Sequence, residues 1–187
     1  MRRQWLAHAE GLVLEIGFGS GLNLPYYGSN TRELMALDRE FDDSPQFRAR
    51  MRSVRFPVLF VKAGAQKIPL QDHSVDTVVS TWTLCSVGAI PAVLAEVRRV
   101  LKPSGKLIFI EHGLCSQKGR GRLRSLQKVW SPIQQKIADG CRVDHDIRAE
   151  IEMAGFQLVD VEEGFVPGCR PMAFFTRGIA RLDENPR

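Results

Sequence analysis

The sequence contains no long apolar run. No apolar run in its 187 residues approaches the roughly 20 consecutive residues that a membrane-spanning helix needs. The opening segment, MRRQWLAHAEG, also lacks the apolar core of a secretory signal. We therefore expect a soluble protein. The chain is long enough for one sizeable core and too short for two ordinary domains, so we expect a single domain over residues 1–187.

Cysteines are few and scattered. Cys85, Cys115, Cys141 and Cys169 form no CxxC pair, and the four histidines do not cluster beside them. This spacing predicts neither a metal site nor a disulfide framework. A reducing compartment suits such a chain, and we expect the cytoplasm.

A nucleic-acid signature is also lacking. The formal net charge of +5 favours anionic partners, but the basic residues follow no known RNA- or DNA-binding motif. Charge alone therefore does not predict a nucleic-acid-binding protein.

What the chain does contain is an alternation of short β-rich runs with longer runs of helical period. This alternation predicts an α/β fold with a mostly parallel, Rossmann-like sheet of seven strands and helices on both faces. The expected strands are Leu12 to Gly17, Leu34 to Leu37, Val58 to Val61, Val75 to Ser80, Leu107 to Glu111, and a terminal pair at Gln157 to Glu162 and Met172 to Thr176.

Helix signals fall between these runs. Ser44 followed by Pro45 predicts an N-cap and a first turn for a helix that continues to Arg52. Apolar residues at helical spacing predict a second helix from Ile90 to Leu101, which Pro103 and Gly105 would end. A third helix is expected from Arg148 to Met153.

The strongest local signal is the run from Leu12 to Gly21, LVLEIGFGSG, in which an apolar strand leads directly into glycines. Gly17, Gly19 and Gly21 allow positive φ and let a ligand approach the backbone without meeting a Cβ atom. Dinucleotide-binding loops have the spacing G-x-G-x-x-G and present a helix N-terminus to a pyrophosphate. Here the spacing is G-x-G-x-G, and the carboxylate of Glu15 opposes a pyrophosphate but suits a positively charged ligand.

Two further segments follow at informative distances. Asp38 ends the second expected strand about 20 residues beyond the loop, where such folds place an acid that accepts hydrogen bonds from ribose hydroxyls. After the third expected strand, the small residues Gly64 and Ala65 leave room for a flat base against the backbone.

Together these residues resemble class I S-adenosylmethionine-dependent methyltransferases, from about Gly11 to Gly113. The resemblance implies S-adenosylmethionine as cofactor, a cofactor-binding half over residues 1–113 and an acceptor-side half over residues 114–187. It also implies that the loop and Glu15 hold the methionine half, that Asp38 binds ribose, and that the segment at Gly64 holds adenine. The cofactor-binding residues expected in this way are Glu15, Gly17, Phe18, Gly19, Gly21, Asp38, Arg39, Gly64, Ala65, Gln66, Thr81 and Trp82.

A narrower resemblance rests on Leu84 to Val87 (LCSV), Phe109 to His112 (FIEH), Trp130 to Pro132 (WSP) and Asp139 to Cys141 (DGC). These runs are similar to the methyltransferase-like group that includes the mammalian alkyl-thiol methyltransferases, which implies a small-molecule acceptor such as a thiol. A quinone, lipid or amine acceptor stays open, as does a protein that binds the cofactor without turnover.

Catalytic candidates stand near the ends of the later strands. His112 is a candidate general base because histidine side chains exchange protons near neutral pH, and Asp139 and His145 flank Gly140 and Cys141. Each is equally consistent with a structural role. Trp82, at the ligand edge of the fourth strand, either contacts the methionine portion or acceptor or packs beneath the neighbouring helix.

A basic stretch runs from Lys118 to Lys128 and includes Arg120, Arg122 and Arg124. With Leu126, Val129 and Trp130 nearby, we interpret it as an amphipathic lid over the acceptor pocket. A weak peripheral membrane contact and a solvated face stay open. The sequence leaves a monomer and a homodimer equally open.

Overall fold

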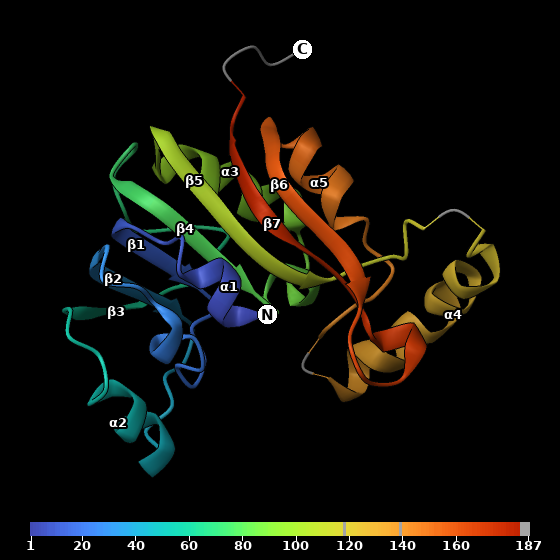
Figure 1. Ribbon diagram of the computed structural model, residues 1–187, viewed down its shortest axis with the longest axis horizontal. Coiled ribbons are helices and arrows are strands. Elements are labelled where there is room, and N and C mark those ends of the chain that lie inside the picture. Colours follow the sequence, from blue (N-terminus) through green and yellow to red (C-terminus); the bar gives the residue numbers. More distant parts are fainter. Residues whose placement is uncertain (118, 139, 184–187) are drawn as a thin grey trace.

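Seven strands form one sheet at the centre of the molecule. The computed structural model describes residues 1–117, 119–138 and 140–183. The strands, drawn as arrows in Figure 1, are β1 Gly11–Ile16, β2 Thr31–Asp38, β3 Val58–Lys62, β4 Val75–Thr81, β5 Leu101–His112, β6 Phe156–Phe165 and β7 Phe174–Leu182.

The strand order across the sheet is β3-β2-β1-β4-β5-β7-β6. Strands β1 to β5 pair in parallel, whereas β7 is antiparallel to both β5 and β6. The chain moves outward from β1 to β3 and then crosses to β4 on the other side of β1. In open α/β sheets, this reversal creates the crevice beyond the carboxyl ends of the strands in which ligands bind.

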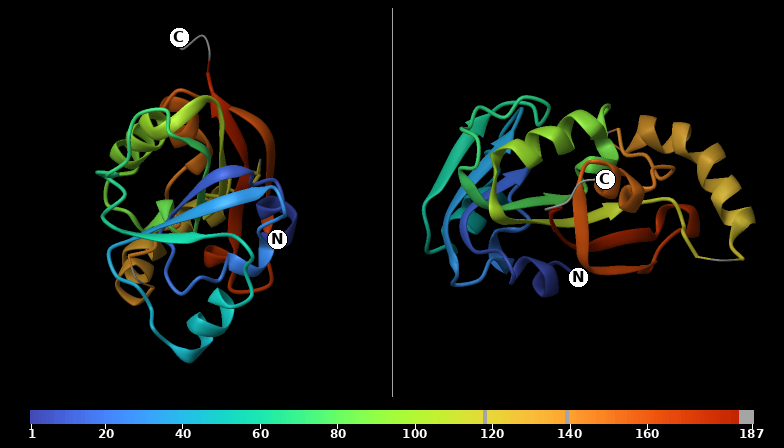
Figure 2. Two further views of the ribbon diagram at one scale, coloured as in Figure 1. Left: turned by 90° about the vertical axis from the view of Figure 1, so that its left-hand side faces the viewer. Right: turned by 90° about the horizontal axis from the view of Figure 1, so that it is seen from above.

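Helices cover both faces of the sheet. In the view from above in Figure 2, α3 and α5 lie on one side and α1 on the other. The helices are α1 Arg2–Leu6, α2 Pro45–Met51, α3 Ile90–Val100, α4 Gly121–Ile137 and α5 Ile147–Met153, with short 3-10 turns at η1 Leu24–Tyr26, η2 Leu84–Ser86 and η3 Arg170–Met172.

The two faces carry separate apolar cores, because successive side chains of a strand point to opposite sides. In β5, Leu107 and Phe109 pack with α3 and α5, whereas Ile108 and Ile110 pack with Trp5 of α1. All of these side chains are buried. A fully covered sheet fixes the strand ends and therefore the crevice that they form.

The predicted α/β class and seven-stranded sheet are confirmed. Ser44 caps α2 by accepting a hydrogen bond from the Phe47 N–H at 3.1 Å, as the Ser-Pro signal indicates. The predicted stop at Pro103 and Gly105 is wrong in position: α3 ends at Val100 and β5 begins at Leu101, so both residues lie within the strand. The last strand begins at Phe174, because Met172 belongs to a 3-10 turn.

Candidate functional site

The loop after β1 is built from glycines in the left-handed backbone region. Gly17 has φ +69° and Gly19 has φ +54°, conformations that disfavour side chains. A Cβ atom on Gly17 would lie 2.1 Å from Thr83 Oγ1, whereas one on Gly19 would meet nothing within 4 Å. Gly17 is therefore required for packing against the segment after β4, and Gly19 keeps open space in front of the loop.

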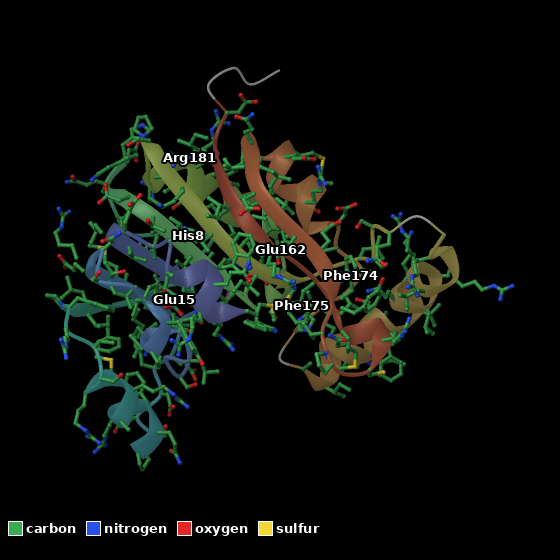
Figure 3. All side chains as sticks on the ribbon, in the orientation of Figure 1. His8, Glu15, Glu162, Phe174, Phe175 and Arg181 are labelled. Carbon is green, nitrogen blue, oxygen red and sulfur yellow. The ribbon has the colours of Figure 1, made fainter. Side chains whose placement is uncertain are left out.

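Glu15 lies at the carboxyl end of β1 and is 1% exposed (Figure 3). Its Oε1 accepts a hydrogen bond from Asn23 Nδ2 at 2.8 Å, and its Oε2 accepts one from the Tyr27 hydroxyl at 2.6 Å. Burial raises the pKa of Glu15 to about 7, and these two donors offset only part of that rise. The position places a buried acidic group beside open backbone and favours a cationic ligand.

Two cavities meet at the glycine loop. The first, which we call the Asp38 cavity, has a volume of about 170 Å³. It is lined by Gly17, Leu37, Asp38, Arg39, Ala63, Gly64, Ala65, Gln66, Thr83, Ser86, Val87 and Gly88. The cavity therefore lies between the ends of β1, β2 and β3 and the segment after β4.

Asp38 is held in place by the backbone around it. Its Oδ2 accepts a hydrogen bond from the Gly19 N–H, and its Oδ1 accepts one from the Arg39 N–H, both at 2.7 Å. Oδ1 also accepts a longer hydrogen bond from the Glu40 N–H at 3.4 Å. A carboxylate has about four lone-pair sites, so these three donors leave capacity for a hydroxyl of a bound sugar. The same residue thus shapes the glycine loop and faces the cavity.

The second cavity, which we call the Glu15 cavity, has a volume of about 600 Å³. It is lined by Arg2, Glu15, Gly17, Phe18, Gly19, Ser20, Leu22, Asn23, Thr81 and Trp82. Gly17 belongs to both cavities, so an elongated ligand can pass across the bare loop from one to the other. An adjoining cavity lined by Met1, Arg2, Arg3, Tyr26 and Trp82 shares Arg2 and Trp82 with it; we call this the Tyr26 cavity.

Trp82 forms a wall between these spaces. Its φ of +56° is rare for a residue with a side chain, and the Arg2 guanidinium lies 4.1 Å from the centroid of its ring. On its other side, Trp82 contacts Phe175 edge to face at 5.4 Å between ring centroids. Trp82 thus lines the Glu15 cavity and packs with the core that contains Trp5 and Phe175. This core lies on the opposite face of the sheet from α3, so the alternative of packing beneath the neighbouring helix is wrong.

Eleven of the twelve predicted cofactor-binding residues line the two cavities, and Gly21 is the exception. With φ +70°, Gly21 is required by the backbone, and a Cβ atom there would lie 2.9 Å from Leu24 Cδ1. Sequence reasoning missed Arg2 and Asn23, which tertiary contacts bring to the Glu15 cavity. It also missed Ser86 and Val87 as lining residues, although both fall in a run that it singled out.

The geometry fits S-adenosylmethionine. The sulfonium and ammonium groups suit a cavity with a buried carboxylate, and the nucleoside suits the Asp38 cavity, where Gly64 and Ala65 offer backbone rather than bulky side chains. The space in front of Gly19 would be filled by a Cβ atom, so the loop is shaped for close ligand approach.

Glu111 organises the segment after β4. This fully buried residue near the end of β5 accepts hydrogen bonds from Ser80 Oγ at 2.6 Å and from the N–H groups of Thr83 and Cys85, both at 3.2 Å. Burial raises the pKa of Glu111. Its contacts give it a structural role in shaping one wall of the Asp38 cavity.

Neither histidine among the catalytic candidates lines the three cavities described above. His112 Nδ1 lies 3.3 Å from Cys141 Sγ and 3.8 Å from Cys85 Sγ, and its ring contacts Phe175. His145 lies before α5, outside the lining of the three cavities described above, and its carbonyl oxygen accepts from the Leu114 N–H. Asp139 is outside the described residues, as is Lys118 of the basic stretch.

Cys85 and Cys141 lie side by side, although 56 positions separate them. Their sulfur atoms are 3.4 Å apart. The hydrogen bond shared by the two thiols, together with the nearby His112 ring, lowers the pKa of Cys141, and the same hydrogen bond raises the pKa of Cys85. Sequence spacing gave no sign of this cluster, because the fold alone brings the three segments together.

Helix α4 stands apart from the sheet at the right of Figure 1. Its polar residues Gln127, Ser131 and Gln134 are buried against the body of the protein, whereas four of its large apolar residues are exposed. Leu126, Val129, Ile133 and Ile137 are 48%, 73%, 48% and 69% exposed. Among the described residues, no helix has the length and apolar character required to cross a membrane.

Known proteins resemble the chain in sequence and in fold. The model of the methyltransferase domain family matches residues 14–109, about half of the chain. Rat thiol S-methyltransferase TMT1B is 34% identical over 160 residues, which are 82% of this chain and 63% of that protein. Human thiol S-methyltransferase TMT1A is 31% identical over 159 residues, 80% of this chain and 62% of that protein. The chain thus spans less than two thirds of the length of these relatives.

A solved structure extends the likeness in fold to nearly the whole chain. The 1,6-didemethyltoxoflavin N1-methyltransferase of Burkholderia thailandensis, solved with S-adenosylhomocysteine, superposes with a TM-score of 0.69 at 15% identity. The match covers 98% of this chain and 77% of that one. Residues 14–109, which the family model matches, contain the glycine loop, Asp38 and the other residues that line the Asp38 cavity. This chain belongs to the methyltransferase domain family.

Proposed function

We propose that this chain transfers the methyl group of S-adenosylmethionine to a small thiol. The observation that carries the proposal is the meeting of the Asp38 and Glu15 cavities at Gly17, with a buried carboxyl group on the methionine side. The thiol is favoured because the relatives named above are thiol S-methyltransferases that share about a third of their residues with this chain.

The cofactor supplies an electrophilic methyl group on a positively charged sulfur. Asp38 would hold the ribose hydroxyls, and Glu15 would face the cationic methionine half. Arg2, which lines the same cavity, is placed to pair with the carboxylate of that half. Gly17 and Gly19 would support the ligand with backbone alone.

The acceptor would enter through the Tyr26 cavity. That cavity joins the Glu15 cavity at Arg2 and Trp82, and it combines apolar lining with the guanidinium groups of Arg2 and Arg3. An amphipathic acceptor with an anionic sulfur suits this combination. Holding it in line with the methyl group is the main contribution of the enzyme, because positioning lowers such barriers by up to about 7 to 11 kcal/mol.

A thiol makes modest demands on acid–base chemistry. With a pKa of about 8.5, a thiol loses its proton to solvent readily, and the thiolate then forms the new sulfur–carbon bond as the donor sulfur leaves uncharged. A phenol or amine requires more help. The proposed bases His112, Asp139 and His145 are therefore dispensable if the acceptor is a thiol.

The experiment is transfer of label from methyl-labelled S-adenosylmethionine to a panel of alkyl thiols, quinols, amines and phospholipids. We expect labelled thioether, with Asp38→Asn strongly reduced and Asp43→Asn unchanged, since Asp43 only pairs with Arg48 on the surface. If only another class of acceptor were labelled, the thiol would be wrong and that class would be the acceptor. Tight cofactor binding without transfer to any acceptor would favour a non-catalytic binding protein.

We also propose that α4 touches membrane surfaces peripherally. Its outward apolar residues are flanked by Arg122, Arg124, Lys128 and Lys136, the combination by which interfacial helices bind anionic lipid. This arrangement favours a surface contact over a lid, because the apolar residues face away from the protein body. We further propose that the protein is cytoplasmic and that it is a monomer or a homodimer.

A further inference from the structure

Three soft ligand groups converge beside the cofactor site. Cys85 comes from η2 after β4, His112 is the last residue of β5, and Cys141 follows α4. Cys85 is fully buried and Cys141 is 6% exposed. None of the three lines the Asp38, Glu15 or Tyr26 cavities, so methyl transfer as proposed above does not use them.

The separations of the three atoms match those of metal ligands. The two Sγ atoms are 3.4 Å apart, and His112 Nδ1 lies 3.3 Å from Cys141 Sγ and 3.8 Å from Cys85 Sγ. In a tetrahedral zinc site with bonds of about 2.3 Å to sulfur and about 2.0 Å to nitrogen, two sulfurs lie about 3.8 Å apart, and sulfur and nitrogen about 3.5 Å apart. The three atoms therefore already form one face of a coordination tetrahedron, to within about 0.4 Å.

We propose that Cys85, His112 and Cys141 bind a zinc ion. Two sulfurs and one imidazole nitrogen are the donors that select zinc over magnesium or calcium, which prefer oxygen. Two thiolates neutralise the charge of a divalent cation, so the bound site carries no net charge in its buried position.

The ligands are oriented by their neighbours, as metal ligands usually are. The Cys85 N–H donates to Glu111 Oε2 at 3.2 Å, and the His112 ring lies tilted against Phe175 with 4.2 Å between centroids. Both contacts fix the ligand atoms before an ion arrives, which lowers the ordering cost of binding.

A fourth group lies next to the three. Gln134 of α4 is 1% exposed, and its Nε2 lies 3.4 Å from Cys141 Sγ. Its Oε1 is buried without a hydrogen-bond partner among the described residues. A half-turn of the amide exchanges the two atoms and brings the oxygen toward the ion. The side chain thus offers a weak fourth ligand that water or another donor can displace.

Such an ion would cross-link three segments that are distant in sequence. Thr83, Ser86 and Val87, which flank Cys85, line the Asp38 cavity, whereas Cys141 ends the segment that carries α4. Zinc binding would therefore fix the cavity wall relative to the acceptor-side half. This inference concerns the chain's own residues and does not rest on the thiol as acceptor.

Cobalt and zinc titrations test the site. The reduced full-length protein is stripped with a chelator and titrated with Co²⁺, whose tetrahedral thiolate complexes absorb strongly, and Zn²⁺ is then added to displace the cobalt. We expect one ion per chain and a rise in melting temperature with Zn²⁺. Absence of a sulfur-to-cobalt charge-transfer band in the reduced wild-type protein would overturn the proposal, whatever the variants do.

Variants locate the ion. Cys85→Ser and Cys141→Ser should each weaken zinc binding by at least about 100-fold, since even the loss of an outer partner costs about 10- to 100-fold. Cys115→Ser and Cys169→Ser remove thiols outside the cluster and should bind zinc like the wild type. Equal binding in all four variants would overturn the location. Gln134→Leu should keep the charge-transfer band and weaken binding by about tenfold, whereas complete loss of the band would contradict the three-ligand assignment.

Discussion

Asn23 donates a hydrogen bond to Glu15 over 2.8 Å at the bottom of the Glu15 cavity. The second donor, the Tyr27 hydroxyl, is also neutral, and Glu15 forms no ion pair among the described residues. Arg2 contributes a smaller coulombic attraction, so a cationic ligand would further stabilise the ionised carboxyl group. The pKa of about 7 that results for Glu15 makes this effect measurable in solution.

The ligand-free protein should lose stability as pH rises toward neutrality. The pKa of Glu15 is 4.5 in an exposed side chain and about 7 in the folded protein, so the unfolded state releases the proton first. The contribution of Glu15 to the free energy of unfolding is therefore fully present below about pH 4.5 and is lost as the pH rises to about 7. Above that pH it no longer changes, and the total loss is about 3 kcal/mol.

Glu15→Gln removes this titration and isolates its effect. Thermal melts from pH 5.5 to 8 should show the variant gaining stability relative to the wild type as pH rises. A constant difference in melting temperature across this range would contradict the raised pKa.

Cofactor binding should release a proton. A sulfonium and an ammonium near Glu15 favour its ionised form, so below about pH 7 binding must expel the carboxyl proton. Affinity should rise about tenfold per pH unit between pH 5.5 and 7 and then level off. Calorimetry in two buffers of different ionisation enthalpy measures the released proton directly, and Glu15→Gln, as the control, should release none.

Gly17 and Gly19 should respond differently to alanine. In Gly17→Ala the new Cβ atom meets Thr83 Oγ1 at 2.1 Å, so the protein should be severely destabilised. In Gly19→Ala the Cβ atom meets only open space, and the strained φ costs about 1 to 2 kcal/mol. Melting curves and cofactor titrations should show a folded Gly19→Ala protein that has lost cofactor affinity. Normal affinity in that variant would place the ligand elsewhere.

Asp38→Asn should weaken cofactor binding while leaving the fold intact. The amide retains one oxygen for a backbone donor but loses the charge that strengthens bonds to ribose hydroxyls. Hydrogen bonds to charged groups contribute about 1.5 to 3 kcal/mol, so affinity should fall by about 10- to 150-fold. Calorimetry measures this change, and Asp43→Asn should show none.

The cofactor half of the site could be predicted from sequence because its signals are local. The glycine loop, Glu15 and Asp38 sit at strand ends, and strand order alone brings such ends to one edge. The alternation of short β-rich runs with runs of helical period also located the strands. Their ends differ by several residues in places, since β5 begins at Leu101 and includes Pro103 and Gly105.

The remaining features depend on contacts between distant segments. Nothing near Arg2 in sequence indicates that it lies over Trp82, and nothing near Cys85 indicates that it meets Cys141. The segment at Gly121–Ile137 was interpreted from sequence as a basic stretch or amphipathic lid, without helix bounds. Its buried face carries polar residues and its exposed face carries apolar ones, the reverse of the usual pattern.

That reversal leads to the prediction for membrane contact. Burying an apolar side chain contributes about 1.5 to 3 kcal/mol, so Ile137→Asp should reduce binding to anionic vesicles at least about tenfold. The side chain is 69% exposed, so the fold should be unaffected. Met153→Asp provides a matched control, because Met153 is 75% exposed but lies on α5. Cosedimentation with phosphatidylserine vesicles measures both, and binding should weaken with salt because Arg122, Arg124 and Lys128 supply part of the attraction. If the two variants sediment like the wild type, the apolar face of α4 serves another partner.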